Sequence, residues 1–154
     1  GKPILLPSAV EALGGNLPHG LTTVIWWHPD WPFQSSLTSE TPRELVDAYE
    51  DHFGVQVNVS TGMNYAGMEI VVDVLTRAAS LDKEKLRDAL AATDLDTIVG
   101  PIKYDDRNVA ETPLVGGQWV PGETWPWELN VVYNPVIPGL EVKEQIMITP
   151  DLYQ

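Results

Sequence analysis

The order in which helix and strand signals alternate along this chain constrains its fold more than any other feature. The clearest signal spans residues 41–54, where Thr41, Pro42 and Glu44 supply an N-cap, a first-turn proline and a capping-box acid. An apolar stripe with helical spacing follows, and Gly54 provides a stop. The segment therefore predicts an amphipathic helix, with one part of the chain before it and another after it.

The part before this helix predicts a strand, a short helix and a second strand. The apolar run 4–6 ends at a proline and is typical of a buried parallel strand. Ser8 and Glu11 have the spacing of a capping box, which favours a helix that begins at Ser8. Residues 21–27 are rich in Thr, Val, Ile and Trp and lie between a glycine and a proline, so they predict the second strand.

The part after the helix predicts helices first and then short strands. Alternation favours strands, and longer apolar periodicity favours helices. On this basis we expect a mostly buried helix at 63–80 and a second helix at 82–93 that is capped by Asp82. The expected strands are 55–59, 97–104, a hairpin at 116–123, 128–135 and a last strand at 142–148. Helices that alternate with strands in this order predict an α/β fold with mainly parallel strands.

Composition excludes several kinds of chemistry. The chain has nine Lys and Arg against 22 Asp and Glu, a formal net charge of −13, and this charge repels nucleic acid phosphates. We therefore expect no nucleic acid partner. It has no cysteine, which removes disulfides, thiolate nucleophiles and cysteine-based zinc sites. No apolar stretch approaches the roughly 20 residues of a membrane-spanning helix.

The remaining side chains form no recognisable catalytic or cofactor motif. The histidines His19, His28 and His52 are dispersed, and none has metal-ligand spacing to another. The paired glycines lack the strand-to-helix context of a nucleotide-binding loop, and no nucleophile elbow is present. We therefore expect no enzymatic activity, no metal and no cofactor.

The motif order resembles a known family. The segments "ETPRELVDAYEDHFG", "MNYAGMEIVVDVLTRAASLDKEKLRDALAATDLDTIVGPIKYDD" and "GGQW" follow one another as in the C-terminal portion of type I periplasmic solute-binding proteins. These belong to the branched-chain amino acid ABC-transporter family, which includes the leucine/isoleucine/valine-binding proteins. The resemblance covers residues 3–133. It departs from the family where "DRN" replaces the usual glycine turn, and the tail after Asn134 matches no pattern.

The resemblance implies an α/β fold of the periplasmic-binding-protein type I, with two Rossmann-like lobes of which only the C-terminal part is present. It assigns residues 1–28 to the end of the second lobe and 29–40 to a crossover. Residues 41–99 are assigned to the first lobe, and 100–154 to a return crossover and a C-terminal β segment. The chain starts without Met or a secretion signal, so we expect it to begin within a longer domain. The alternative is a rearranged domain that folds alone.

The resemblance also implies a function and partners. The expected function is that of the periplasmic, secreted solute-binding component of a bacterial ABC uptake transporter. Its expected partners are a small-molecule solute, the membrane subunits of the transporter, and the missing N-terminal portion of the same protein or a second chain. Two alternatives stay open: a cytoplasmic ligand-sensing regulator with the same fold, and a sugar-binding module that uses Trp119, Trp125 and Trp127.

Five residues are candidates for binding the solute between the lobes. Ser8 lies at an expected helix N-terminus, and Asn64 with Tyr65 lies at another, where free backbone N–H groups attract the polar end of a solute. Trp26 and Trp27 end the expected strand 21–27 and point to opposite faces, so one of them can line the cleft with Tyr65.

Each candidate also has a purely structural interpretation. In this interpretation Ser8 caps a helix and does nothing else, Tyr65 packs under its helix, and both tryptophans belong to the core. Trp31 is expected to pack the crossover. If a tryptophan does line the cleft, we expect an apolar or aromatic solute.

Overall fold

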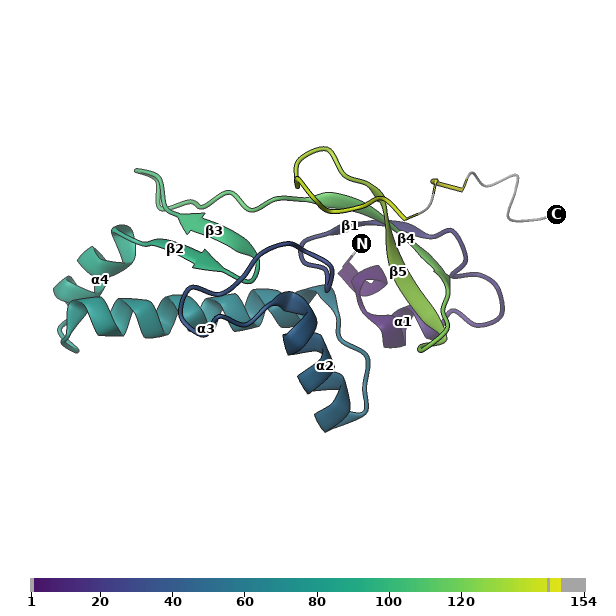
Figure 1. Cartoon of the computed structure of the whole chain (residues 1–154), viewed down its shortest axis with the longest axis horizontal. Helices are drawn as coiled ribbons and strands as arrows, with labels where there is room; N and C mark the ends of the chain where they lie inside the picture. Colours follow the sequence, from purple (N-terminus) through teal and green to yellow (C-terminus); the bar gives the residue numbers. More distant parts are fainter. Residues whose placement is uncertain (1, 144, 148–154) are drawn as a thin grey trace.

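The computed structural model describes residues 2–143 and 145–147 of the chain (Figure 1). The molecule is elongated. At one end lie the helices α3 and α4 with the hairpin β2–β3, and at the other lies the sheet of β1, β4 and β5 with α1 against it; α2 projects from the middle. The elements are η1 (Lys2–Leu5), α1 (Pro7–Glu11), β1 (Thr22–Ile25), α2 (Pro42–Phe53), α3 (Val59–Ala78), α4 (Lys83–Ala91), β2 (Asp94–Thr97), β3 (Gly100–Lys103), β4 (Val115–Pro121) and β5 (Trp127–Tyr133).

Both sheets are antiparallel, so the prediction of mainly parallel strands is wrong. The larger sheet has the order β1-β4-β5, with Thr22 opposite Gln118 and Pro121 opposite Trp127. The smaller sheet is the hairpin β2–β3, with Thr97 opposite Gly100. The reason lies in the connections, because β2–β3 and β4–β5 are joined by short turns, whereas parallel neighbours need a long crossover.

The N-terminal segment also differs from its prediction. Residues Lys2–Leu5 form a 3-10 helix instead of a buried parallel strand. Helix α1 begins at Pro7, and Ser8 is inside its first turn with no capping hydrogen bond. Proline is favoured at the first helical position because its fixed backbone angle suits a helix and its missing N–H would be unpaired there. The spacing of Ser8 and Glu11 is therefore not a capping box.

Helix α2 is confirmed in detail. The Thr41 side chain accepts a hydrogen bond from the Glu44 backbone N–H, and the Glu44 carboxylate accepts one from the Thr41 N–H at 2.8 Å. Gly54 ends the helix in the left-handed conformation, with φ of 64°. The cap of α4 is confirmed as well, since the Asp82 carboxylate accepts bonds from the N–H groups of Glu84 and Lys85.

Helix α3 begins earlier than expected. Asn58 caps it by accepting a hydrogen bond from Ser60 N–H at 2.9 Å, while Thr61 closes a reciprocal capping box. Residues 55–59 consequently form no strand, and the helix N-terminus does not lie at Asn64. The capping amide competes for the backbone at this point, and local side-chain bonding of this kind favours helix initiation over extended structure.

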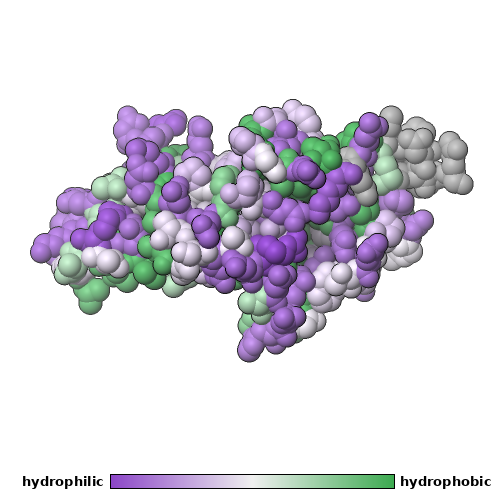
Figure 2. All heavy atoms as spheres, viewed as in Figure 1, coloured by the Kyte–Doolittle hydropathy of each residue, from purple (hydrophilic) through white to green (hydrophobic). Residues whose placement is uncertain are grey.

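Only one face of α3 is buried, although most of the helix surface was expected to be. Figure 2 shows apolar atoms among the charged ones at the end of the molecule formed by α3 and α4. The exposed apolar side chains on α3 are Met68, Val71, Val72 and Leu75, each more than 40% exposed. An apolar helix face of this kind ordinarily packs against another element.

The main core joins the two ends of the molecule. It contains buried side chains from both sheets and from the connections between them: Ile25, Trp27, Trp31, Val46, Val59, Ile98, Val99, Val115 and Val131. The chain passes between the two ends after β1 and again between β3 and β4 (Figure 1). The expected last strand is not formed by residues 142, 143 and 145–147, and the rest of that range lies outside the described residues.

Candidate functional site

A cavity of about 270 Å³ lies where the two ends of the molecule meet. Its walls come from α2, from the segment that enters α3, from residues 27–30 after β1, and from the β4–β5 hairpin. Its lining combines three tryptophans, Trp27, Trp119 and Trp125, with a set of charged and amide side chains. A concave, partly apolar site with a few convergent polar groups is the usual form of a small-molecule site.

Trp27 forms one aromatic wall of this cavity. It is only 1% exposed, and its indole ring packs against Gly62 of α3. Its Nε1 has no hydrogen-bond partner among the described residues, whereas the Nε1 of Trp119 donates to the Ile4 carbonyl at 2.8 Å. A buried N–H that stays unpaired is costly, so the Trp27 indole is held in place by packing and not by a hydrogen bond among the described residues.

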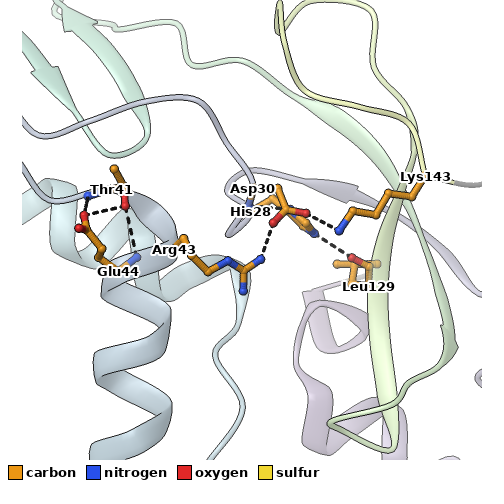
Figure 3. A network of polar contacts seen from close by, with 7 residues as sticks. All are labelled: His28, Asp30, Thr41, Arg43, Glu44, Leu129 and Lys143. Atoms are coloured by element: carbon orange, nitrogen blue, oxygen red, sulfur yellow. Dashed lines mark hydrogen bonds and ion pairs between the residues drawn. The ribbon is translucent and has the colours of Figure 1, made fainter.

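His28 follows Trp27 and is fixed by two hydrogen bonds (Figure 3). Its Nε2 donates to the Leu129 carbonyl at 3.2 Å, and its Nδ1 accepts from the Asp30 N–H at 3.1 Å. Burial lowers the pKa of His28 to about 4, against the raising effect of the nearby Asp30 carboxylate. His28 is therefore neutral at pH 7 and both of its ring nitrogens are occupied.

Asp30 joins three elements of the site through its carboxylate (Figure 3). One oxygen pairs with Arg43 from the first turn of α2, and the other lies 2.6 Å from Nζ of Lys143. Partial burial acts to raise the pKa of Asp30, but the contacts with the Lys143 and Arg43 cations outweigh it and lower the pKa to about 2. The carboxylate is thus charged at pH 7 and is shared by two cations.

Two further carboxylates line the cavity and are bonded to neutral donors. Glu50 accepts from the Val57 N–H and from Nε1 of Trp125, both at 3.0 Å. Glu128 accepts from the Thr124 N–H at 3.1 Å and from the Trp125 N–H. No cation in the described part of the chain pairs with either acid.

The arrangement brings together groups of different chemistry. It offers an apolar wall, a region with two cations on one carboxylate, and a region with two carboxylates. Among the described residues of the cavity, no serine or threonine hydroxyl is hydrogen-bonded to a histidine in the manner of a nucleophile and its base. In the same part of the chain, no group of three His, Asp or Glu side chains could hold a metal ion.

The structure brings only one of the five candidate residues into this cavity. Trp27 lines it, whereas Trp26 is half-buried and packs on the outside of the core. Ser8 and Asn64 are exposed on α1 and α3. Tyr65 donates from its hydroxyl to Glu40 at 2.5 Å, which ties α3 to the connection before α2.

Trp31 lies where it was expected. It is 3% exposed and meets the ring of Phe33 edge to face, within the connection between β1 and α2. The three tryptophans of the alternative sugar-binding hypothesis do not form one exposed surface, because Trp119 is 2% exposed.

Sequence reasoning missed His28, Asp30, Arg43, Glu50 and Lys143 as site residues. The "WWHPDWP" segment held a usable signal, because a histidine and an aspartate after a strand lie where ligands bind in α/β proteins. Arg43 gave no distinct signal, because a polar residue in the first turn of a helix is ordinary. Lys143 gave no signal, because it is far from the others in the sequence.

A junction between two parts of a mixed α/β fold is a common location for small-molecule sites. The profile of the periplasmic binding protein family matches residues 3–123 of this chain, which therefore belongs to that family. No helix in the described ranges 2–143 and 145–147 is long and apolar enough to cross a membrane.

Solved structures share the fold. A leucine-binding protein from Thermotoga maritima superposes with a TM-score of 0.63 and 22% identity, covering 84% of this chain and 35% of that one. A periplasmic binding protein from Burkholderia mallei superposes with a TM-score of 0.65 and 16% identity, covering 90% of this chain and 36% of that one. A third structure is a solute-binding protein of an ABC transporter from Rhodopseudomonas palustris in complex with 3,4-dihydroxybenzoic acid. It superposes with a TM-score of 0.59 and 19% identity, covering 81% of this chain and 34% of that one.

These comparisons confirm the resemblance to type I periplasmic solute-binding proteins. They also show that the chain spans about 35% of the length of the structures that it matches. The division into lobe segments 1–28, 29–40, 41–99 and 100–154 stays a prediction.

Proposed function

We propose that this chain is part of the solute-binding component of an ABC uptake transporter and acts in the periplasm. The observation that carries the proposal is the family match over residues 3–123, which includes most of the cavity lining. In this proposal the cavity at Trp27 is one wall of a cleft between two lobes. The solute is a small organic molecule, either amino-acid-like or aromatic.

The chemistry of the cavity supports both kinds of solute. The indole of Trp27 offers an apolar surface. Arg43 and Lys143 at Asp30 suit a carboxylate, and the acids Glu50 and Glu128 suit an ammonium group. Two of the similar structures point the same way, since one is a leucine-binding protein and another is in complex with 3,4-dihydroxybenzoic acid.

The proposed partners follow from what the chain leaves uncovered. The exposed apolar face of α3 requires a covering element, and the chain spans about 35% of the structures that it matches. We propose that the N-terminal portion of the same protein, or a second chain, supplies this cover. The membrane subunits of the transporter would then receive the solute from the completed protein.

Equilibrium binding tests the proposal. The chain is titrated with leucine and, separately, with 3,4-dihydroxybenzoate while tryptophan fluorescence is followed, and the solute is recovered and identified by mass spectrometry. We expect saturable binding of at least one solute, weakened at least tenfold by Trp27→Ala but not by Ser8→Ala or Asn64→Ala. Chemical conversion of the bound solute would show an enzyme instead.

The same titration separates the site from the core. Trp27 is buried, so its replacement lowers stability whatever its role. The affinity of Trp27→Ala is therefore measured at a temperature where the variant is folded. Unchanged affinity in that variant would assign Trp27 to the core alone and remove this cavity from the proposal.

A further inference from the structure

Residues 140–143 and 145–147 lie beyond the part of the chain that matches the family, and they are held at two points, one on β4 and one just after β5. At one end the side chain of Gln118, 1% exposed, binds Met147 in both directions: its Nε2 donates to the Met147 carbonyl at 3.1 Å, and its Oε1 accepts from the Met147 N–H at 2.9 Å. At the other end the Asn134 amide donates to the Leu140 carbonyl at 2.8 Å.

Lys143 lies between these two anchors and reaches Asp30 (Figure 3). Its Nζ is 2.6 Å from the Asp30 carboxylate, which also pairs with Arg43. The Lys143 side chain is 53% exposed and that of Asp30 only 27%. The lysine therefore approaches the cavity from solvent, while the aspartate is fixed inside.

The charges around this point leave one cation in excess. Asp30 carries one negative charge and faces two positive ones, and His28 is neutral because burial keeps its pKa low. The cavity lining also contains Glu50 and Glu128, whose carboxylates are bonded to backbone and indole N–H groups and not to these two cations. A solute carboxylate near Lys143 can thus form an ion pair with this lysine while Asp30 remains paired with Arg43.

We infer that Lys143 is a specificity-determining residue, which makes this cavity select solutes that carry a carboxylate. The inference deepens the proposed solute-binding function and rests on it. Its structural basis is the placement of one cation by a segment outside the family match, held by Gln118 and Asn134. A charge-assisted bond to a carboxylate is strong and directional, so one lysine can decide between an acid and its amide.

The absence of cysteine from the chain gives a test that needs no known solute. Asn130→Cys places a single thiol in the cavity lining. Its modification rates are measured with two methanethiosulfonate reagents of similar size, one ending in a sulfonate anion and one in a trimethylammonium cation, at low ionic strength. The ratio of the anionic to the cationic rate reports the charge felt at the cavity.

We expect Lys143→Gln to lower this ratio by about sevenfold. One unit charge roughly 7 Å away in a medium close to water changes each rate by about 2.7-fold, in opposite directions for the two reagents. Lys143→Arg should preserve the ratio, which separates charge from loss of fold. Lys103→Gln is the matched control, because Lys103 is also paired with one aspartate, Asp94 at 2.5 Å, in the other sheet.

Two results would overturn the inference. One is a change with Lys143→Gln no larger than with Lys103→Gln, and the other is a thiol that neither reagent reaches in any variant. Both leave the proposed function open to its own test, since the thiol assay involves no solute. Conversely, a charge-selective cavity in a chain that binds neither leucine nor 3,4-dihydroxybenzoate would count against the proposed function alone.

Discussion

The indole of Trp27 lies so close to Gly62 of α3 that a β-carbon at Gly62 would overlap the ring. Gly62→Ala should therefore destabilise the chain by about 1–3 kcal/mol, because overpacking a fixed ring outweighs the better helix propensity of alanine. Gly67→Ala is the matched control in the same helix, since its β-carbon would meet nothing within 4 Å, and it should stabilise by about 0.5–1 kcal/mol. Urea unfolding of both variants measures the difference, and equal effects would contradict the close contact.

Acid should weaken the fold through His28. The pKa of His28 is about 4 in the folded chain, against 6.5 for an unperturbed histidine, so between these values the unfolded chain binds more protons. The free energy of unfolding therefore has its full value, as far as His28 is concerned, above pH 6.5. It falls as the pH drops toward 4, by about 3 kcal/mol in total. His28→Asn should flatten this part of the profile, with His52→Gln as control. A wild-type stability that stays level between about pH 7 and pH 5 would show that the fold does not lower the pKa of His28.

The side-chain cap of α3 should contribute to the stability of the chain, whereas the cap expected for α1 should not. Asn58→Ala should cost about 1 kcal/mol, because the Ser60 N–H loses its side-chain acceptor at the helix start. Ser8→Ala should change the free energy of unfolding little, since Ser8 makes no capping bond. Thermal melts of the two variants give the comparison. The reverse order would restore the capping box that the sequence suggests at Ser8.

Arg77 should hold α4 against α3. Its guanidinium donates to the Ala89 carbonyl at 2.6 Å and to Thr93 Oγ1 at 3.1 Å, while Asp73 one turn earlier orients it. Arg77→Ala should destabilise by about 1–2 kcal/mol, because the end of α4 loses two bonds to α3. Arg87→Ala, which removes an exposed arginine with only local acidic partners, should have little effect. Hydrogen exchange of α4 amides would localise the change, and equal exchange in both variants would argue against the clamp.

The exposed apolar face of α3 should make the chain associate when it is alone. Sedimentation of the 154-residue chain should show self-association or a broad, weakly cooperative melt. Val72→Lys should reduce association by placing a charge on that face, and Lys85→Glu on exposed α4 serves as control. A monomer with a sharp cooperative transition would remove the need for a covering partner.

Local signals in the sequence determined the elements that depend on neighbouring residues. The capping box of Thr41 and Glu44 and the cap at Asp82 were predictable, because these bonds form within one helical turn. The motif order likewise indicated the family. Where two local signals competed, the sequence was ambiguous: Pro7 displaced Ser8 at the start of α1, and Asn58 moved the start of α3 ahead of Asn64.

The tertiary structure alone decided the pairing of strands and the composition of the site. Strand direction depends on how the chain returns, and short turns made the hairpin pairs antiparallel. Trp27 could be named from its place after β1, but its neighbours in the cavity come from segments far apart in the chain. Asp30 meets Arg43 and Lys143 only because packing of the core brings α2 and residues 140–143 to the same point, and sequence spacing carries no record of such a contact.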